Sequence, residues 1–130
     1  MNNLIKLFCT AVLFGAVHTA NAQTFMTEEE MLNTFPGATI GGISSQDNST
    51  PWEQTYGQPK KGKKKGKGKG LWNNSDKYKF SWKIKKGKWC EDWGSGRACW
   101  DVERIDETTL QMYKKGKKLP NVWTIMKPAS

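Results

Sequence analysis

The sequence predicts a small α+β fold in which a short N-terminal helix packs on an antiparallel β meander that carries one hairpin disulfide. Three observations predict it. Residues 77–85 alternate between polar and apolar side chains, as a strand with one buried face does. A helix-capping pattern starts at Thr27, and Cys90 and Cys99 flank a glycine turn. The pattern leaves open whether the sheet closes into a barrel.

The first residues, MNNLIKLFCTAVLFGAVHTANA, have the layout of a secretory signal peptide. Lys6 supplies a positive n-region, residues 7–17 form an apolar run, and residues 20–22 (ANA) are a small-x-small cleavage site. A transmembrane anchor would need about 20 apolar residues, so this run is too short. We therefore expect residues 1–22 to be removed on export and residues 23–130 to form a single small domain, periplasmic or secreted. No later segment is apolar enough to span a membrane.

The helix is expected near the start of the exported domain. Thr27 and Glu30 form a capping box around the acidic run EEE, whose charges suit the positive end of a helix dipole. Met31, Leu32 and Phe35 follow as an apolar stripe, and the PG sequence after them ends the helix. We expect a helix over residues 28–35 with this stripe in the core.

Short strands joined by Gly, Asp and Asn turns are expected over the rest of the chain. The clearest one, KYKFSWKI, puts its lysines on one face and its apolar side chains on the other. The apolar face carries Tyr78, Phe80, Trp82 and Ile84. Close spacing of such strands is typical of an antiparallel meander. Most of the aromatic residues are expected to pack in its core.

The segment WCEDWGSGRACW predicts a disulfide-bridged hairpin. Counting outward from a two-residue type II′ turn at residues 94–95 pairs Cys90 with Cys99. This pair falls on a non-hydrogen-bonded position, where side chains approach closely. An oxidising compartment favours the bridge. The other pairs of this register include Glu91 with Ala98, Asp92 with Arg97, Lys88 with Asp101, and Trp89 with Trp100.

Export also narrows the chemistry that the domain can perform. The single histidine, His18, lies in the signal peptide, so a Ser-His-Asp triad and a Cys-His nucleophile are excluded. The two remaining cysteines fit no common zinc-site pattern. The acidic residues come in neighbouring pairs without a recognisable cleft, so glycosidase chemistry is not indicated. We expect a non-enzymatic protein without catalytic residues, metal or cofactor.

The most unusual stretch is QPKKGKKKGKGKG, residues 58–70. Because glycine disfavours regular structure, we expect a flexible, extended loop that binds by charge alone. The basicity is local: beyond residue 22 the chain has a net charge of +8, and this run supplies seven lysines. The residues expected to bind a polyanion are Lys60, Lys61, Lys63, Lys64, Lys65, Lys67, Lys69 and Trp72.

The expected partner is a polyanion or an anionic envelope surface, such as nucleic acid, lipopolysaccharide or anionic lipid. Trp72 follows the run and is expected to stack on bases, and the lysines of residues 77–85 extend the basic surface. The alternative is a structural or inhibitor-like module that binds an unknown periplasmic protein, with the run as a solubilising spacer. A third hypothesis is glycan binding by Trp52, Trp72 and Trp93.

Several of these features follow one another in a characteristic order. The short helix is followed by PG-x-T at residues 36–39, a strand ending near Trp82, and then Gly87, Cys90, Trp93 and Cys99. This order resembles a family of small exported bacterial domains of unknown function, found mainly in alphaproteobacteria, over about residues 27–126. The family's strand usually carries glycine where this chain has Phe80, and relative to the family the Lys/Gly run looks like an insertion. The resemblance implies an extracytoplasmic β domain and no catalytic role.

Overall fold

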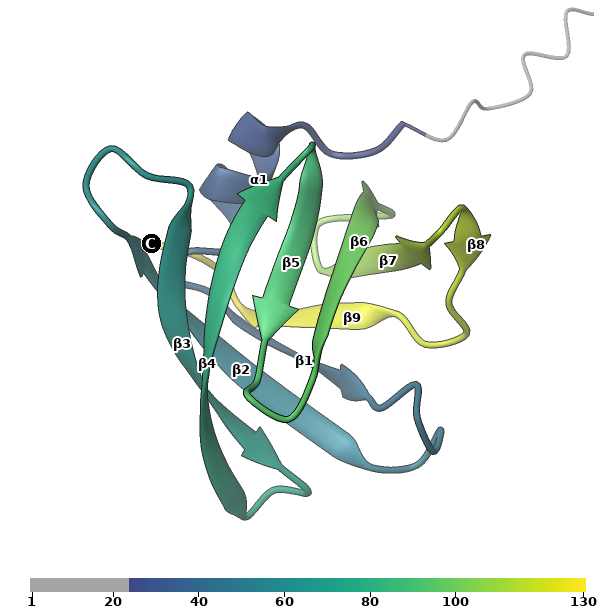
Figure 1. Cartoon of the computed structure of the whole chain (residues 1–130). Helices are drawn as coiled ribbons and strands as arrows, with labels where there is room; N and C mark the ends of the chain where they lie inside the picture. The colour runs from purple at the N-terminus through teal and green to yellow at the C-terminus, as the bar shows by residue number, and fades with distance from the viewer. Residues whose placement is uncertain (1–23) are drawn as a thin grey trace, which may run out of the picture.

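The computed structural model describes residues 24–130, so the expected signal peptide lies outside the described residues. In this part of the chain one helix is followed by nine strands (Figure 1). The elements are α1 (Glu28–Thr34), β1 (Thr39–Ile43), β2 (Pro51–Pro59), β3 (Lys65–Trp72), β4 (Asp76–Lys85), β5 (Lys88–Asp92), β6 (Arg97–Arg104), β7 (Thr109–Lys114), β8 (Lys117–Lys118) and β9 (Trp123–Lys127).

The strands form an antiparallel meander that closes into an eight-stranded barrel. Consecutive strands pair from β1 to β7, β7 also pairs with β9, and β9 returns to pair with β1. In the closing register Ile40 lies opposite Ile125, while β8 forms a short hairpin with β7. The expected fold of a helix, a meander and a hairpin disulfide is confirmed, and the structure adds the closure that the sequence left open.

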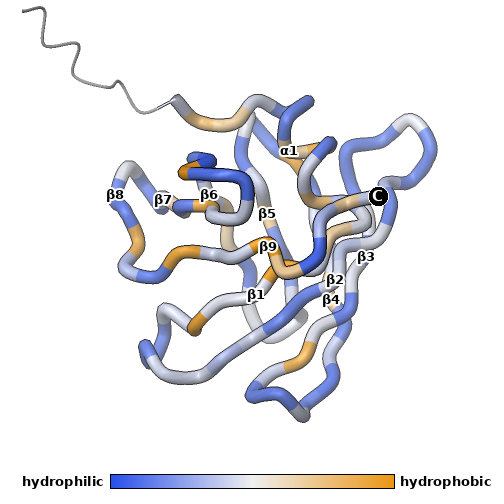
Figure 2. Tube along the Cα trace, turned by 180° about the vertical axis from the view of Figure 1, so that it is seen from behind, coloured by the Kyte–Doolittle hydropathy of each residue, from blue (hydrophilic) through white to orange (hydrophobic). Residues whose placement is uncertain are grey.

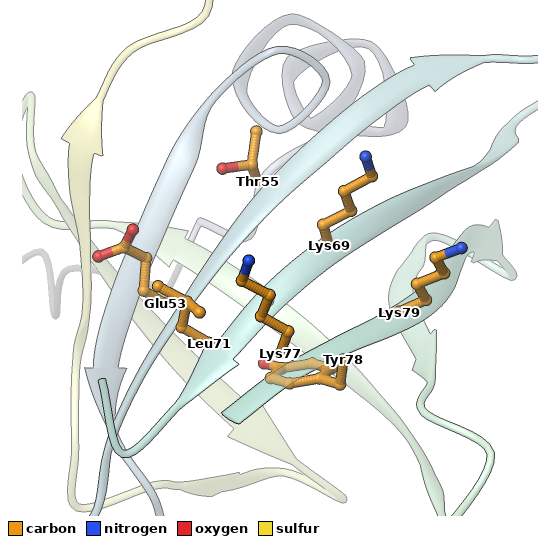
Figure 3. A pocket seen from close by; sticks show the side chains of 8 residues that line it. Glu53, Thr55, Lys69, Leu71, Lys77, Tyr78 and Lys79 are labelled. Atoms are coloured by element: carbon orange, nitrogen blue, oxygen red, sulfur yellow. The ribbon is translucent and has the colours of Figure 1, made fainter. Parts of the chain in front are cut away.

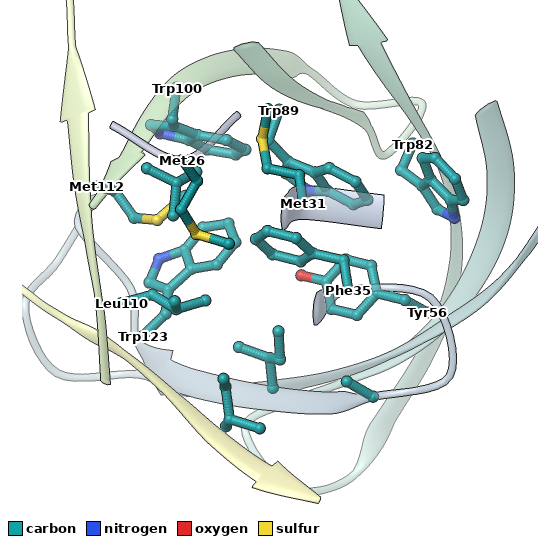
Figure 4. Close-up of a cluster of buried hydrophobic side chains, with 14 of the residues drawn as sticks. Met26, Met31, Phe35, Tyr56, Trp82, Trp89, Trp100, Leu110, Met112 and Trp123 are labelled. Carbon is teal, nitrogen blue, oxygen red and sulfur yellow. The ribbon is translucent and has the colours of Figure 1, made fainter. Parts of the chain in front are cut away.

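Helix α1 covers one end of the barrel. Its N-terminus has the expected capping box, because the Thr27 hydroxyl accepts a hydrogen bond from the backbone N–H of Glu30 at 3.1 Å. Met31 and Phe35 point into the barrel and are fully buried (Figure 4). The Phe35 ring stacks on Trp89 with 4.0 Å between ring centroids. The helix therefore contributes a layer of the barrel's core.

Aromatic side chains from several strands fill the barrel around this layer (Figure 4). Trp82 stacks on Trp89 at 4.8 Å, and Trp100 meets Trp123 edge-on at 4.9 Å. Such pairs add specific attraction to the large apolar area that each ring buries. The expectation that most aromatic residues pack in the core is therefore confirmed. Figure 2 shows hydrophobic stretches on β1, β7 and β9, whereas β3 and β4 are mostly hydrophilic along their length.

The hairpin of β5 and β6 has the register that the sequence predicted. Cys90 lies opposite Cys99 and is bonded to it, with 4.0 Å between the two Cα atoms. Gly94 has a φ of +84°, which is the left-handed conformation that the turn requires. The expected ion pair between Lys88 and Asp101 is present at 2.6 Å. The bridge and the ion pair lie on adjacent outward positions of the barrel wall.

The prediction of a flexible loop over residues 58–70 is wrong. Residues 58–59 end β2, residues 60–64 form a turn, and β3 starts at Lys65, between β2 and β4. The Lys60 N–H donates to the Lys65 carbonyl at 2.9 Å, which helps to order the turn. The lysines of β3 are exposed and its glycines are buried, as period two requires. The Lys/Gly alternation is therefore the two faces of a strand.

The physical reason for this strand lies in its neighbour β4. Gly66, Gly68 and Gly70 point into the barrel, opposite Trp82, Phe80 and Tyr78 respectively. A Cβ at residue 66 would lie only 2.7 Å from the Trp82 ring, and side chains at residues 68 and 70 would likewise overlap the opposing rings. The aromatic residues of β4 thus fill the space that the glycines leave.

Candidate functional site

The outward side chains of β3 and β4 form a strongly basic surface. We call seven of them the lysine track: Lys65, Lys67 and Lys69 on β3, and Lys77, Lys79, Lys83 and Lys85 on β4. All seven are exposed. Ser81 and Leu71 occupy the remaining outward positions within this span. The structure thus joins three lysines of the run to the basic face expected on the next strand.

The other lysines of the run lie in the turn between β2 and β3. Lys64 forms an ion pair with Glu28 at the start of α1. The remaining ones, which we call the turn lysines, are Lys60, Lys61 and Lys63, and all are exposed. The turn leads directly into the end of the track at Lys65. The seven lysines that the sequence grouped together therefore belong to two different structural settings.

Like charges face one another across the lysine track. Lys69 lies directly opposite Lys79, and Lys65 lies opposite Lys83. Over residues 24–130 the ion pairs are Lys64 with Glu28 and Lys88 with Asp101, so no track lysine has a carboxylate partner. Directly opposed like charges destabilise a sheet. The track is therefore an arrangement that costs folding stability.

The strand framework fixes the spacing of these charges. Outward residues on one strand are separated by about 6.6 Å, and neighbouring strands lie about 4.8 Å apart. An open hollow of about 720 Å³ lies between β2 and β4, with Lys69, Lys77 and Lys79 on its rim (Figure 3). Glu53 and Leu71 also line it. The track presents regularly spaced ammonium groups that can approach an anion from two rows.

Trp72 is not part of this surface. It is three residues from Lys69, and the alternation of a strand places it on the opposite face, together with the glycines of β3. It pairs across the sheet with Trp52 and is half-buried. Trp93 is half-buried as well. The structure therefore does not bring Trp72 together with the lysines, as stacking of a base beside them would require.

A second group of polar residues lies inside the barrel, around Glu91. The Gln54 amide N–H donates to one carboxylate oxygen at 2.7 Å, and the Tyr56 hydroxyl and the Trp89 indole N–H donate to the other at 2.9 and 2.8 Å. Tyr78 donates to the Gln54 amide oxygen at 2.7 Å. Burial raises the pKa of Glu91, and the hydrogen bonds from Gln54, Trp89 and Tyr56 offset part of that rise.

This internal network is complete without a ligand. Among the described residues every fully buried side-chain nitrogen and oxygen has a hydrogen-bond partner. Glu91 is 2% exposed and Gln54 is 3% exposed, so neither is open to solvent. Sequence reasoning missed the network because it considered Glu91 only as the hairpin partner of Ala98 and as one of several neighbouring acidic residues. The sequence does contain a sign of the network: Glu91 is two residues from Trp89 on the same strand, so both side chains point into the barrel. We assign the network to the stability of the core.

The described residues also bear on the other chemistries considered from the sequence. Residues 24–130 contain no cluster of three or more His, Cys, Asp or Glu side chains arranged to hold a metal ion. None of the described helices has the length and apolar character needed to cross a bilayer. The absence of enzymatic activity stays a prediction from the sequence.

Comparison with protein-family models, curated proteins and solved structures finds no match for this chain. The resemblance to exported alphaproteobacterial domains therefore stays a prediction.

Proposed function

We propose that this protein is a non-enzymatic envelope protein, exported to the periplasm or beyond, that binds polyanions through the lysine track. The observation that supports the proposal is the opposition of Lys69 to Lys79 and of Lys65 to Lys83 without any carboxylate partner in the described chain. Such pairs oppose folding, whereas a bound polyanion would neutralise them. The arrangement is therefore typical of a surface that is completed by an anionic partner.

Pre-organisation supports the same proposal. A mobile lysine-rich loop loses conformational freedom when it binds, whereas lysines on a paired strand have already lost their backbone freedom on folding. The backbone of β3 is paired on both sides, with β2 and with β4. The binding residues of the proposal are therefore those of the track, with the turn lysines at its end and without Trp72.

The alternative was a protein-binding module in which the Lys/Gly run is a solubilising spacer, and most of that run is not a spacer in the structure. Residues 65–72 are an internal strand of the barrel and their glycines are buried. A protein-binding module without this polyanion site would show negligible affinity for polyanions at physiological salt. That difference separates the two functions experimentally.

The test uses a fluorescent oligothymidylate of about 20 nucleotides and measures its dissociation constant at several salt concentrations. The log–log slope for a single strand is about −0.7 per phosphate contact, so seven engaged lysines give about −5. In the variant Lys67→Gln/Lys69→Gln/Lys79→Gln the slope should become shallower by about 2. Glutamine removes the charge but keeps part of the apolar stem.

The matched control removes the same amount of charge from another exposed lysine cluster. Lys114, Lys117 and Lys118 lie on the β7–β8 hairpin, away from β3 in the fold (Figure 1). Their replacement by glutamine should leave the slope nearly unchanged. Equal losses in the two triple variants would mean that binding follows net charge and would contradict a site on the track. Absence of binding by the wild type would contradict the function itself.

A further inference from the structure

The lysine track is narrow. It is two strands wide, and its rows lie about 4.8 Å apart. On the side of β2 the outward residues include the neutral Thr55, opposite Lys69, and Glu53, opposite Leu71. On the side of β5 the outward residues are Asp92, the disulfide cysteine Cys90, and Lys88, which Asp101 neutralises. Positive charge therefore ends within one strand on either side of the track.

The track is also long in one direction. From Lys77 to Lys85 it follows β4 over eight residue steps, which corresponds to about 27 Å of strand. The β3 lysines run beside it over part of this length. β3 and β4 curve around the barrel wall (Figure 1). A surface of this shape suits a flexible chain of anions that can follow the curve.

A flat anionic membrane fits the track less well. A plane that touches the curved wall engages only part of the track, and it brings Glu53 and Asp92 toward its own negative charge. Stable binding to membranes generally needs an apolar element in addition to basic charge. Among the outward side chains of β3 and β4 only Leu71 is apolar, and it is half-buried.

Bases of a nucleic acid would find no stacking partner on the track. The aromatic residues of β2, β3 and β4 all occupy the inward positions of their strands: Trp52, Tyr56, Trp72, Tyr78, Phe80 and Trp82. Proteins that bind single strands usually combine a basic groove with aromatic side chains that stack on bases. The track offers the first element and lacks the second.

We propose that the ligand of the track is a flexible linear phosphate chain that is recognised through its phosphates alone, without contact to bases. This inference rests on the proposed function and narrows it from polyanions in general. The ammonium groups of the two rows pair with successive phosphates, and the exposed Ser81 hydroxyl, between Lys79 and Lys83, donates to a phosphate oxygen. The chain can be the backbone of a single-stranded nucleic acid or an inorganic polyphosphate.

The experiment compares four probes on the wild-type protein under one set of salt concentrations. They are an oligothymidylate, an abasic oligodeoxyribose phosphate with the same number of phosphates, an inorganic polyphosphate of matched length, and phosphatidylglycerol vesicles. We expect the abasic chain to bind within about threefold of the oligothymidylate and with the same salt slope, because stacking contributes nothing. Polyphosphate should also bind, whereas vesicles should bind more weakly at equal accessible phosphate.

Three outcomes would overturn the inference while leaving the proposed function in place. A loss of about tenfold or more for the abasic chain would show that bases are contacted. Tighter binding of vesicles than of either phosphate chain would favour a membrane surface. Binding of the oligothymidylate but not of polyphosphate would assign the site to the nucleic-acid backbone and contradict recognition by phosphates alone. If no probe binds, the proposed function fails as well.

Trp72 provides an independent variant for the same inference. Trp72→Leu should change the affinity for oligothymidylate by less than about twofold, because the side chain lies on the face opposite to the track. Circular dichroism and thermal unfolding establish that the variant is folded. A folded variant that loses about tenfold affinity for oligothymidylate, but none for the abasic chain, would show stacking on Trp72 and contradict the inference.

Discussion

Gly68 of β3 lies directly opposite Phe80 of β4, and the phenyl ring fills the space that a side chain at residue 68 would occupy. Gly66 and Gly70 stand in the same relationship to Trp82 and Tyr78. The three glycines therefore allow the barrel wall to pack against large rings. Because side chains alternate along a strand, the same pattern turns every lysine between them toward solvent. Packing inside the barrel and charge outside it are two results of one sequence pattern.

Gly68→Ala tests this packing. The new methyl group would overlap the Phe80 ring and approach the Thr55 carbonyl, so we expect the free energy of unfolding to fall by about 1–3 kcal/mol. Chemical denaturation measures the change. In the double variant Gly68→Ala/Phe80→Leu the loss should be smaller than the sum of the two single losses.

The control for this substitution is Gly96→Ala in the β5–β6 turn. A Cβ at residue 96 would meet no atom within 4 Å, and Gly96 is not in the left-handed region. We expect a change of less than about 0.5 kcal/mol. If Gly68→Ala lowers the free energy of unfolding no more than Gly96→Ala does, packing of the β4 rings over the β3 glycines is not what specifies the strand.

Lys79→Glu should separate stability from binding. It replaces a like-charged pair with an ion pair between the introduced carboxylate and Lys69, so we expect stability to rise by about 0.2–1 kcal/mol. The affinity for oligothymidylate should fall at the same time, since the new carboxylate lies within the track. Lys127→Glu is the control, because Lys127 is exposed and lies opposite Thr39. A loss of stability in Lys79→Glu that exceeds the loss in the control would contradict the claim that the track opposes folding.

How much of the fold was predictable depends on how local the signal is. The β5–β6 register follows from a turn and two cysteines within ten residues, so it could be derived correctly. The strand β3 could not be derived in this way, because glycine and lysine both have low strand propensity. Its specification comes from Tyr78, Phe80 and Trp82 on the next strand. Barrel closure depends on pairing of β1 with β9, which no local pattern encodes.

The candidate site divides in the same way. The sequence identifies Lys65, Lys67 and Lys69 as basic residues, but the opposition of Lys69 to Lys79 depends on the turn between β3 and β4. That turn holds Asn73 and Asn74 at positive φ angles of 54° and 63°, and this geometry is not evident from composition. The burial of Glu91 likewise appears only when the barrel is closed. Charge was predictable from the sequence, whereas its spatial arrangement was not.

The disulfide contributes to stability through a short closed loop. A bridge over nine residues of separation is worth about 2–3 kcal/mol in the chain-entropy model. Cys90→Ser/Cys99→Ser should therefore lower the melting temperature by several degrees. Thiol labelling of the native, unreduced wild type should find neither cysteine reactive. Full labelling of both cysteines would show that the bridge does not form in the protein as isolated.

Glu91 should give the barrel a specific pH dependence. Burial raises its pKa in the folded state above the ordinary value of 4.5, so the folded protein keeps this proton to a higher pH than the unfolded chain does. The contribution of protonated Glu91 to the free energy of unfolding is fully present below pH 4.5, and it is lost as the pH rises through the folded-state pKa. Glu91→Gln cannot titrate here. The stability of the wild type relative to this variant should therefore fall as the pH rises.

Chemical denaturation at a series of pH values from 4.5 upward measures the difference in the free energy of unfolding between the wild type and Glu91→Gln. The control is Glu107→Gln, because Glu107 is exposed and its carboxylate makes no hydrogen bond or ion pair within residues 24–130. Its stability should run parallel to that of the wild type. If the wild type gains stability relative to Glu91→Gln as the pH rises, the hydrogen bonds from Gln54, Tyr56 and Trp89 outweigh burial, and folding lowers the pKa of Glu91 instead of raising it.

We conclude that the Lys/Gly run is a fixed strand that carries an ordered row of lysines. Native-state amide hydrogen exchange of residues 65–71, followed by NMR, measures whether this strand is stably formed. β3 is paired on both sides, so its amides should exchange at least about 1,000-fold more slowly than those of an unstructured peptide. Exchange within about tenfold of the unstructured rate would mean that the run is a mobile segment, and both the strand and the lysine track would be contradicted.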